Sequence, residues 1–501
     1  MDQKKSGIIL SYISLGINIL TGILYTPIML RMLGQHEYGI YELVNSIVAY
    51  LNLLNLGLTS SYIKFYTKEK INGTNDDISK VNGMFMQMFL VISAIALILG
   101  ILMITNIQFI GEKYTEQDFQ LARFLMFFML INMVISFPNA LFVAFMSAKE
   151  EFVYQRLIIV ICNIAMPLIN IPLLYNGGGS KGIIVVTSIL TLVRFILNVF
   201  FCLSKLNMKF IFKDYKSGLF KELMSFTFFI FLSDVVDQLN QNIDKFLLGR
   251  LIGAVSVAIY SVGFSLKLYF TTLSWVIPEV FIPKVNRLVE ENDNKGVNTV
   301  FVNTGRMSNF VLMPVILGFI IFGKKFVCLW AGNNYSESYY VAVILIISGY
   351  IPAIQSIGVN IQNALNKHQI RSIVYFVIAI ANVILSIRLI PKYGAVGTSI
   401  GTLIAVLLGS GIFMNIYYHK KIGLDMFEFW KEIVKMYPAA LVSFFVGYIL
   451  ERYLKSVTWG NLCIELCIFV IFYVVFMWKF ALKTEEKDTF INILKKVKRI
   501  A

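Results

Sequence analysis

Apolar runs of about 18 residues or more recur along almost the whole chain, from residues 8–30 to residues 462–482. An α-helix of that length spans the hydrocarbon core of a bilayer. Because unpaired backbone polar groups are not tolerated in lipid, such runs fold as membrane-spanning helices. Only 15% of the 501 residues are charged, whereas about a quarter are charged in soluble proteins. The chain is therefore predicted to be an all-α, polytopic membrane protein.

The hydropathy pattern predicts about fourteen transmembrane helices. The predicted limits are 8–30, 38–62, 83–105, 119–146, 153–175, 182–203, 224–249, 254–282, 301–323, 338–363, 371–390, 395–418, 436–454 and 462–482. The spans at 38–62 and 224–249 are the least apolar of these. The connections are too short to hold a soluble catalytic domain.

An internal repeat with an offset of about 219 residues organises the spans. It aligns Arg31 with Arg250, Gly34 with Gly253 and Tyr41 with Tyr260. Two pseudo-symmetric halves of six helices each are therefore predicted, followed by two C-terminal helices. The predicted parts are a six-helix bundle at 1–203, a cytoplasmic linker at 204–222, a second six-helix bundle at 223–420, and two appended helices with a basic cytoplasmic tail at 421–501.

The distribution of basic residues predicts the orientation. Most of the 44 Lys and Arg fall in segments that this map places on the same side as the N-terminus. By the positive-inside rule both termini are predicted to be cytoplasmic. The formal net charge of +15 mostly reflects this bias and favours anionic membrane lipids as partners, not nucleic acid. The five Cys residues have no His at metal-ligand spacing, so neither a metal site nor another cofactor is predicted.

The predicted span at 224–249 has an unusually polar second half. On a helical wheel, Asp237, Gln238, Gln241, Asp244 and Lys245 cluster around Asp234, and the opposite face is apolar. This pattern is typical of a helix that lines a wet cavity. Two alternatives remain open: an amphipathic helix on the membrane surface, and a purely structural pair of Asp244 with Lys245 at the helix end.

The repeat relates this polar face to the first predicted span. At the offset of 219, Asn18 aligns with Asp237 and Tyr25 aligns with Asp244. Both faces are therefore predicted to line one central cavity. The residues predicted to bind substrate in it are Arg31, Lys64, Arg194, Lys245, Lys267, Gln238, Gln241, Asn18 and Tyr25. Snorkelling to the interface is the alternative role for Arg31 and Lys64.

Three carboxylates, those of Asp234, Asp237 and Asp244, are candidates for ion coupling. Asp234 and Asp237 lie one helical turn apart, so one of them is expected to hold a proton nearer neutrality than an isolated carboxylate does. The coupling ion would be H⁺ or Na⁺. Alternatively, both carboxylates are simply solvated, or they balance the charge of Lys267.

Several stretches carry a resemblance to a known family. They are "LRMLGQHEYGIYELVNSIVAYLNLLNLGLTSSYIKFY" at 30–66, "IDKFLLGRLIGAVSVAIYSVGFSLK" at 243–267, "FIPKVNRL" at 281–288 and "PKYGAVGTSIGTLIA" at 391–405. In order and spacing they resemble the polysaccharide flippases, the O-antigen and capsule precursor transporters of the multidrug/oligosaccharidyl-lipid/polysaccharide (MOP) exporter superfamily. The likeness covers nearly the whole chain.

The resemblance implies a function. Such a protein would move undecaprenyl-pyrophosphate-linked oligosaccharides across the bacterial plasma membrane by alternating access, with an ion gradient as the energy source. A cationic cavity would hold the pyrophosphate. A polysaccharide polymerase and glycosyltransferases of the same pathway are the implied protein partners.

Other classes are less consistent with the sequence. An enzyme of the same pathway would be expected to show a long external loop or a catalytic constellation, and the chain has neither. A drug or ion antiporter of the same superfamily would be expected to have twelve helices. A flippase for the peptidoglycan lipid precursor, which also has fourteen helices, stays open as an alternative. A structural or receptor protein would have no use for charges that line a cavity.

Overall fold

The computed structural model describes residues 3–213, 219–365, 367, 369–454, 456–484 and 486–487, and within these ranges it consists of helices without any strand. The predicted all-α fold is confirmed. The chain divides into two compact units, Met1–Ala258 and Ile259–Ala501. The first unit includes the predicted seventh span. The repeat and the compact units divide the chain by different criteria, so the predicted boundaries at 203 and 223 stay predictions.

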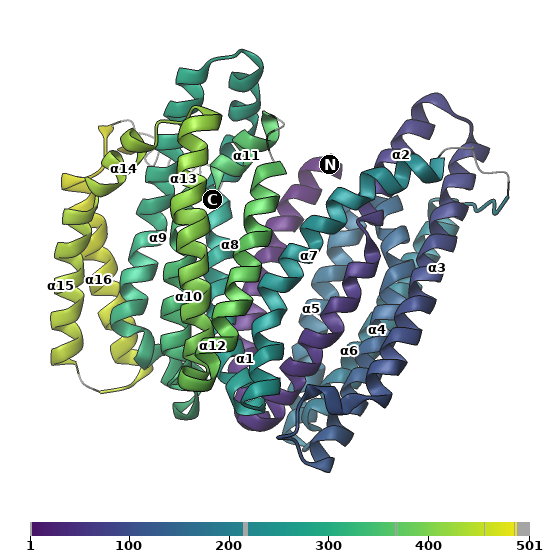
Figure 1. Ribbon diagram of the computed structural model, residues 1–501, viewed down its shortest axis with the longest axis horizontal. Helices are drawn as coiled ribbons and strands as arrows, with labels where there is room; N and C mark the ends of the chain where they lie inside the picture. The colour runs from purple at the N-terminus through teal and green to yellow at the C-terminus, as the bar shows by residue number, and fades with distance from the viewer. Residues whose placement is uncertain are drawn as a thin grey trace. The chain divides into compact units, whose positions relative to one another are not determined.

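The first unit is a bundle of long helices. Its elements are α1 (Gln3–Ala49), the 3₁₀ turn η1 (Tyr50–Asn55), α2 (Leu58–Asn72), α3 (Asn75–Thr105), η2 (Ile107–Ile110), α4 (Glu116–Ala148), α5 (Phe152–Tyr175), α6 (Gly179–Phe200), a π-helical turn (Phe201–Lys205) and α7 (Leu219–Leu251). Within this unit α4 packs against α3 and α6, and α1 packs against α5 and α7 (Figure 1).

Gly34 interrupts α1 at the point where two predicted spans meet. Its φ of 71° lies in the region that only glycine adopts without strain, so the chain turns there between the spans 8–30 and 38–62. Gly253, its partner in the repeat, has a φ of 123° and stands between α7 and α8. The same residue type thus makes the same kind of turn at both related positions.

Two helices of the first unit begin with a reciprocal cap. Thr74 and Asp77 form a capping box at the start of α3, and Thr115 and Asp118 form one at the start of α4. Each box satisfies two backbone N–H groups that the first helical turn leaves without partners. These caps place the starts of α3 and α4 before the apolar stretch of each helix.

The second unit contains the remaining helices. They are most of α8 (Ala254–Glu290), α9 (Asn294–Trp330), η4 (Asn333–Tyr335), α10 (Ser338–Ile354), α11 (Ile357–Ala364), α12 (Gln369–Val406), a π-helical segment (Leu407–Phe413), α13 (Met414–Tyr417), a second π-helical turn (Tyr418–Ile422), α14 (Met426–Val434), α15 (Tyr437–Tyr453) and α16 (Trp459–Phe480). Gly394, with a φ of 56°, breaks α12 between the predicted spans 371–390 and 395–418.

The described chain contains ten helices that are long and apolar enough to cross a bilayer, or eleven if α10 and α11 form one bent span. Two of the ten, Ile13–Asn72 and Ile370–Ile422, are long enough to cross twice, and they contain the breaks at Gly34 and Gly394. A polytopic membrane fold is therefore confirmed, and the count of fourteen stays a prediction.

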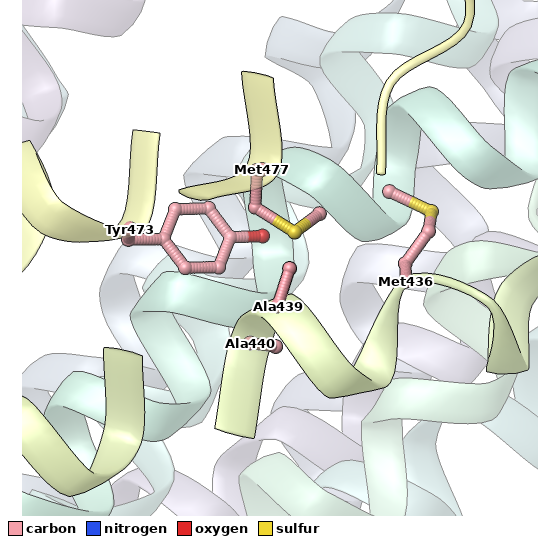
Figure 2. Close-up of a cluster of buried hydrophobic side chains, with 5 residues drawn as sticks. All are labelled: Met436, Ala439, Ala440, Tyr473 and Met477. Carbon is pink, nitrogen blue, oxygen red and sulfur yellow. The ribbon is translucent and has the colours of Figure 1, made fainter. Parts of the chain in front are cut away.

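The two C-terminal helices pack on α9 through an apolar cluster. Its buried members come from the start of α15 and from α16 (Figure 2). They are Met436, Ala439, Ala440, Tyr473 and Met477. The Tyr473 hydroxyl also donates a hydrogen bond to the Phe310 carbonyl of α9 at 3.0 Å, so the tyrosine is satisfied at both its apolar and its polar end.

Arg306 of α9 holds the same C-terminal segment through charge. Its side chain is 1% exposed, and its guanidinium donates to Glu486 at 2.6 and 2.9 Å and to Glu432 at 3.3 Å. It also donates to the carbonyls of Glu432 and Ala481. Lys483 pairs with Glu432 from the other side at 2.7 Å. A buried guanidinium is tolerated here because its donors meet acceptors on three chain segments.

We expect Arg306→Ala to release the C-terminal segment from α9. The substitution leaves Glu432 and Glu486 without their buried partner, and breaking such a pair costs about 3–5 kcal/mol. The midpoint of thermal unfolding in detergent should fall. In limited proteolysis, the segment that follows residue 420 should be cleaved sooner than in the wild type. Lys324→Ala is the control, because Lys324 is an exposed basic residue of the same helix. Equal unfolding midpoints for both variants would contradict this role of Arg306.

Candidate functional site

The side chains on the polar face of α7 differ in exposure along the helix. Asp237 and Gln241 are exposed on the surface of the first unit, Asp234 and Gln238 are half-buried, and the face ends in a buried pair of residues. Asp234 and Asp237 lie close enough for their carboxylates to repel each other. The Gln238 side chain accepts a hydrogen bond from Asn242 at 2.7 Å. The half of α7 that reads as polar in the sequence therefore offers exposed acidic and amide groups near its middle.

The buried end of this face carries an ion pair between helices. Lys245 Nζ lies 2.7 Å from Glu42 Oε2, and the two side chains are 10% and 14% exposed. Glu42 lies on the part of α1 that follows Gly34. Two charges removed from water in this way stabilise the fold only as a pair. The contact therefore fixes α7 against α1.

Close backbone packing accompanies this ion pair. A side chain at Gly39 would meet the Ala254 carbonyl at 1.9 Å, and one at Gly249 would meet Leu43 at 2.5 Å. Ala254 begins α8 and Leu43 lies on α1, so Gly39 lets α1 approach the start of α8 and Gly249 lets α7 approach α1. Lys245 is therefore enclosed on the side that faces α1.

Asp244, the neighbour of Lys245, is 1% exposed and lies near a break in the second predicted span. The Tyr50 hydroxyl is close enough to interact electrostatically with its carboxylate. Tyr50 begins η1, after which Leu56 and Gly57 adopt left-handed conformations with φ of 49° and 66°. Non-helical backbone at membrane depth is tolerated only where protein or a water-filled cavity surrounds it. The break therefore places irregular backbone beside α7.

Side chains from the loop before α4 complete the end of α7. Lys113 Nζ donates to the Leu251 carbonyl at 2.8 Å, and the Tyr114 hydroxyl donates to the Gly249 carbonyl at 2.9 Å. Burial raises the pKa of Tyr114 well above its ordinary value, with a smaller effect from nearby Asp118, so the phenol stays a donor. The last carbonyls of a helix have no partners within the helix, and these two donors satisfy them.

The other predicted site residues of the first unit differ in how exposed their side chains are. Asn18, Arg31 and Lys64 are exposed, and Arg194 is half-buried on α6 within electrostatic range of Cys162. Tyr25 is 7% exposed, and its hydroxyl faces Asn170 of α5. Of the predicted residues in this unit, Asp244, Lys245 and Tyr25 are therefore buried, and Asn18, Arg31 and Lys64 lie on the surface.

Lys267 belongs to the second unit and is half-buried on α8. Its ammonium lies 5.0 Å from the centre of the Phe264 ring, a distance at which a cation is attracted to an aromatic face. The ring therefore supports the charge at a depth where bare ammonium groups are unfavourable.

Several charged contacts are absent from the sequence-based prediction. Glu37 accepts hydrogen bonds from the Ser180 backbone and hydroxyl, both at 2.6 Å, and His36 Nε2 lies 2.8 Å from Asp118 Oδ1. Glu42 was a recognisable signal, because it is the only acidic residue in the predicted span 38–62. Its partner Lys245 lies 203 residues away in the sequence, so no local spacing indicates the pair.

These features define a class of protein. Charges paired inside a bundle of membrane helices, and helix breaks at membrane depth, are typical of transporters. Among the residues that the structure describes, no group of three His, Cys, Asp or Glu side chains could hold a metal ion. The arrangement can bind and move a polar solute.

Comparison with known structures gives a protein of similar fold. The fold is similar to that of the lipid II flippase MurJ in its inward closed conformation, with a TM-score of 0.78 at 17% identity over 94% of this chain and 98% of the other. At this identity the likeness concerns the fold alone.

Sequence comparison then gives the family. Residues 28–340 match the family described as polysaccharide biosynthesis protein, and the chain belongs to this family. It is 21% identical over 398 residues to a protein assigned as an O-antigen transporter of Shigella flexneri, covering 77% of this chain and 91% of the other. It is 20% identical to a protein assigned as the flippase AglR of Haloferax volcanii, covering 78% of each chain.

We expect removal of either partner of the Glu42–Lys245 pair to destabilise the protein, and a charge exchange to restore part of the loss. Glu42→Ala or Lys245→Ala leaves a buried charge alone, at a cost of about 3 kcal/mol or more. The double variant Glu42→Lys with Lys245→Glu restores opposite charges at the same two places. The measurement is the midpoint of thermal unfolding in detergent, with Lys70→Ala, at an exposed residue of α2, as the control. If the single variants unfold at the wild-type temperature, the pair does not fix α7 to α1.

Proposed function

We propose that this protein is a flippase that moves undecaprenyl-pyrophosphate-linked oligosaccharide repeat units from the inner to the outer leaflet of the plasma membrane by alternating access, with both termini in the cytoplasm. The match of residues 28–340 to a polysaccharide biosynthesis family carries this proposal. The charged and amide groups on α1, α7 and α8 support it, because a lipid-linked glycan brings a diphosphate and many hydroxyls through a membrane interior that accepts neither. The polymerase and glycosyltransferases of the same pathway would be its partners.

The cationic side chains suit the diphosphate. Arg31 and Lys64 are exposed, Arg194 and Lys267 are half-buried, and all four are near apolar helix surface. A guanidinium can bind phosphate oxygens in a bidentate manner, and an ammonium binds them as a point charge. Lys245 fits this role less well, because its ammonium is already paired with Glu42. Asn18, Tyr25, Gln238 and Gln241 would bind the neutral parts of the substrate.

A peptidoglycan lipid-precursor flippase is the second candidate. The fold likeness to the lipid II flippase MurJ favours it, since the two chains share nearly their whole length. The two substrates have the same kind of lipid diphosphate and differ in the sugars. A drug or ion antiporter of the superfamily is the third candidate.

Deletion of the gene in the organism that encodes the chain separates these candidates. We expect the surface polysaccharide to disappear and its lipid-linked repeat unit to accumulate on the cytoplasmic side, as measured by mass spectrometry of extracted lipids. Re-expression of the wild-type chain should restore export. Accumulation of the peptidoglycan precursor instead would establish the second candidate, and unchanged pools of both lipids would exclude both flippase functions.

The acidic face of α7 supports coupling to an ion gradient. Asp234 is half-buried and Asp237 is exposed one turn away, so the pair can exchange an ion with water while it lies at membrane depth. Two carboxylates that repel each other gain from taking up one H⁺ or one Na⁺. Asp244 suits this role less, because it is 1% exposed.

We expect Asp234→Asn or Asp237→Asn to abolish gradient-driven transport of lipid-linked glycan in proteoliposomes. Asparagine keeps the size of the side chain but can neither titrate nor supply a negative charge. Binding of the lipid-linked substrate should stay within about threefold of wild type, since the cations are intact. Separate pH and Na⁺ gradients identify the ion, and Asp76→Asn, at an exposed carboxylate in the first turn of α3, is the control. Full gradient dependence in both variants would exclude α7 as the coupling site.

A further inference from the structure

A separate cavity of about 460 Å³ lies in the second unit, between the last turns of α8 and the short helix α11. Its lining is rich in carboxamides. The polar lining residues are Asn286, Glu290, Asn360 and Asn363, and the apolar ones include Ile282 and Val289. The volume is in the range of known small-molecule sites, which combine apolar walls with a few fixed polar groups.

Helical spacing places these residues on facing surfaces. Ile282, Asn286 and Glu290 are successive fourth residues of α8, and Asn360 and Asn363 are three apart on α11, so each set lies on one face of its helix. The axis bends by 44° between α10 and α11, which turns α11 out of line with the span before it. The cavity is therefore a consequence of this bend and of the length of α8.

One lining residue of the cavity has an amide nitrogen that forms no hydrogen bond with the described part of the chain. The Asn360 side-chain nitrogen is buried and has no hydrogen-bond acceptor among the residues that the structure describes. A buried amide donor without an acceptor is unfavourable, and such groups in native proteins are usually satisfied by a ligand or by water. Asn286, Asn363 and Glu290 are exposed at the mouth of the same cavity.

The chemistry of the lining selects among ligands. A carboxamide offers two donors and one acceptor in a plane, which suits neighbouring sugar hydroxyls, each of them both donor and acceptor. Ile282 and Val289 offer apolar surface to the C–H face of a sugar ring. A diphosphate would require Lys or Arg, whereas the one charged residue among the described lining residues is the acidic Glu290, which repels it. A single carboxylate is also too few for a bound divalent cation.

We propose that this cavity is a recognition site for the sugar part of the lipid-linked substrate, separate from the cations that bind its diphosphate. The inference depends on the proposed function and adds to it a specific glycan site. The lining residues lie at or just beyond the ends of the predicted spans 254–282 and 338–363. With a cytoplasmic N-terminus these two spans, the eighth and the tenth, are predicted to end on the cytoplasmic side. Sugars that are assembled in the cytoplasm would meet this site before the substrate enters the membrane interior.

The test measures binding of the free glycan to the full-length protein in lipid nanodiscs. The probe is the oligosaccharide that mild acid releases from the lipid-linked repeat units of the encoding organism, labelled with a fluorophore at its reducing end. Fluorescence anisotropy should show saturable binding to the wild type. Asn360→Leu, which removes the buried amide at nearly constant size, should weaken binding at least tenfold. Inorganic pyrophosphate should not displace the glycan.

Two further variants keep the outcome decisive. Asn286→Ala with Asn363→Ala changes only exposed side chains, so the fold is kept and binding should again fall at least tenfold. Asn294→Ala, at an exposed asparagine outside the cavity, should bind like wild type. Wild-type affinity in both cavity variants, or displacement by pyrophosphate, overturns the inference. If the wild-type chain supports polysaccharide export but does not bind the glycan, the proposed sugar site is wrong and the proposed function stands. A wrong proposed function would instead be shown by the gene-deletion experiment.

Discussion

A charge inside a membrane helix bundle is stable only when it meets an opposite charge or water, and this constraint explains most of the polar architecture of the chain. Lys245 meets Glu42 between α7 and α1, and Arg306 meets Glu432 and Glu486 between α9 and the C-terminal segment. Each pair joins segments that are far apart in sequence. The charges thus fix how helices pack, which apolar contacts in lipid cannot do alone because lipid tails are equally apolar.

The same constraint governs the breaks in the helices. Gly34, Gly253 and Gly394 turn the chain where glycine alone is unstrained, and each turn lies at the junction of two predicted spans. The break at Leu56 and Gly57 is different, because it lies inside a predicted span. The protein around it must meet the backbone groups that the break releases, and α7 and α3 pack on η1. The first unit thus combines regular helices with the irregular segment at Leu56 and Gly57.

The sequence was sufficient to predict the membrane class, the span boundaries on either side of Gly34 and Gly253, and the polar character of α7, because these depend on local composition and periodicity. The family was predicted from the resemblance of four stretches of the chain. It was insufficient for the partners. The wheel put Asp244 and Lys245 on the same face as Asp237, but a wheel cannot show that the neighbouring helix covers one end of that face and leaves the other exposed. Glu42 and Arg306 acquire their roles only through residues about 120 to 200 positions away. Such contacts depend on tertiary packing, which single-sequence periodicity does not contain.

The substrate class that the family implies has three chemically different parts, and the described residues divide accordingly. A polyprenyl tail needs only apolar surface, which the lipid and the exposed apolar side chains of the helices provide. A diphosphate needs cations, and the proposed function assigns this role to Arg31, Lys64, Arg194 and Lys267. Sugars need neutral groups that both donate and accept, and three carboxamides line the cavity of α8 and α11 beside a carboxylate that disfavours phosphate. A cation at that cavity would hold the diphosphate in place of the sugars, so a described lining of carboxamides and one carboxylate favours recognition of the glycan by its hydroxyls and not by the charge that all such lipids share.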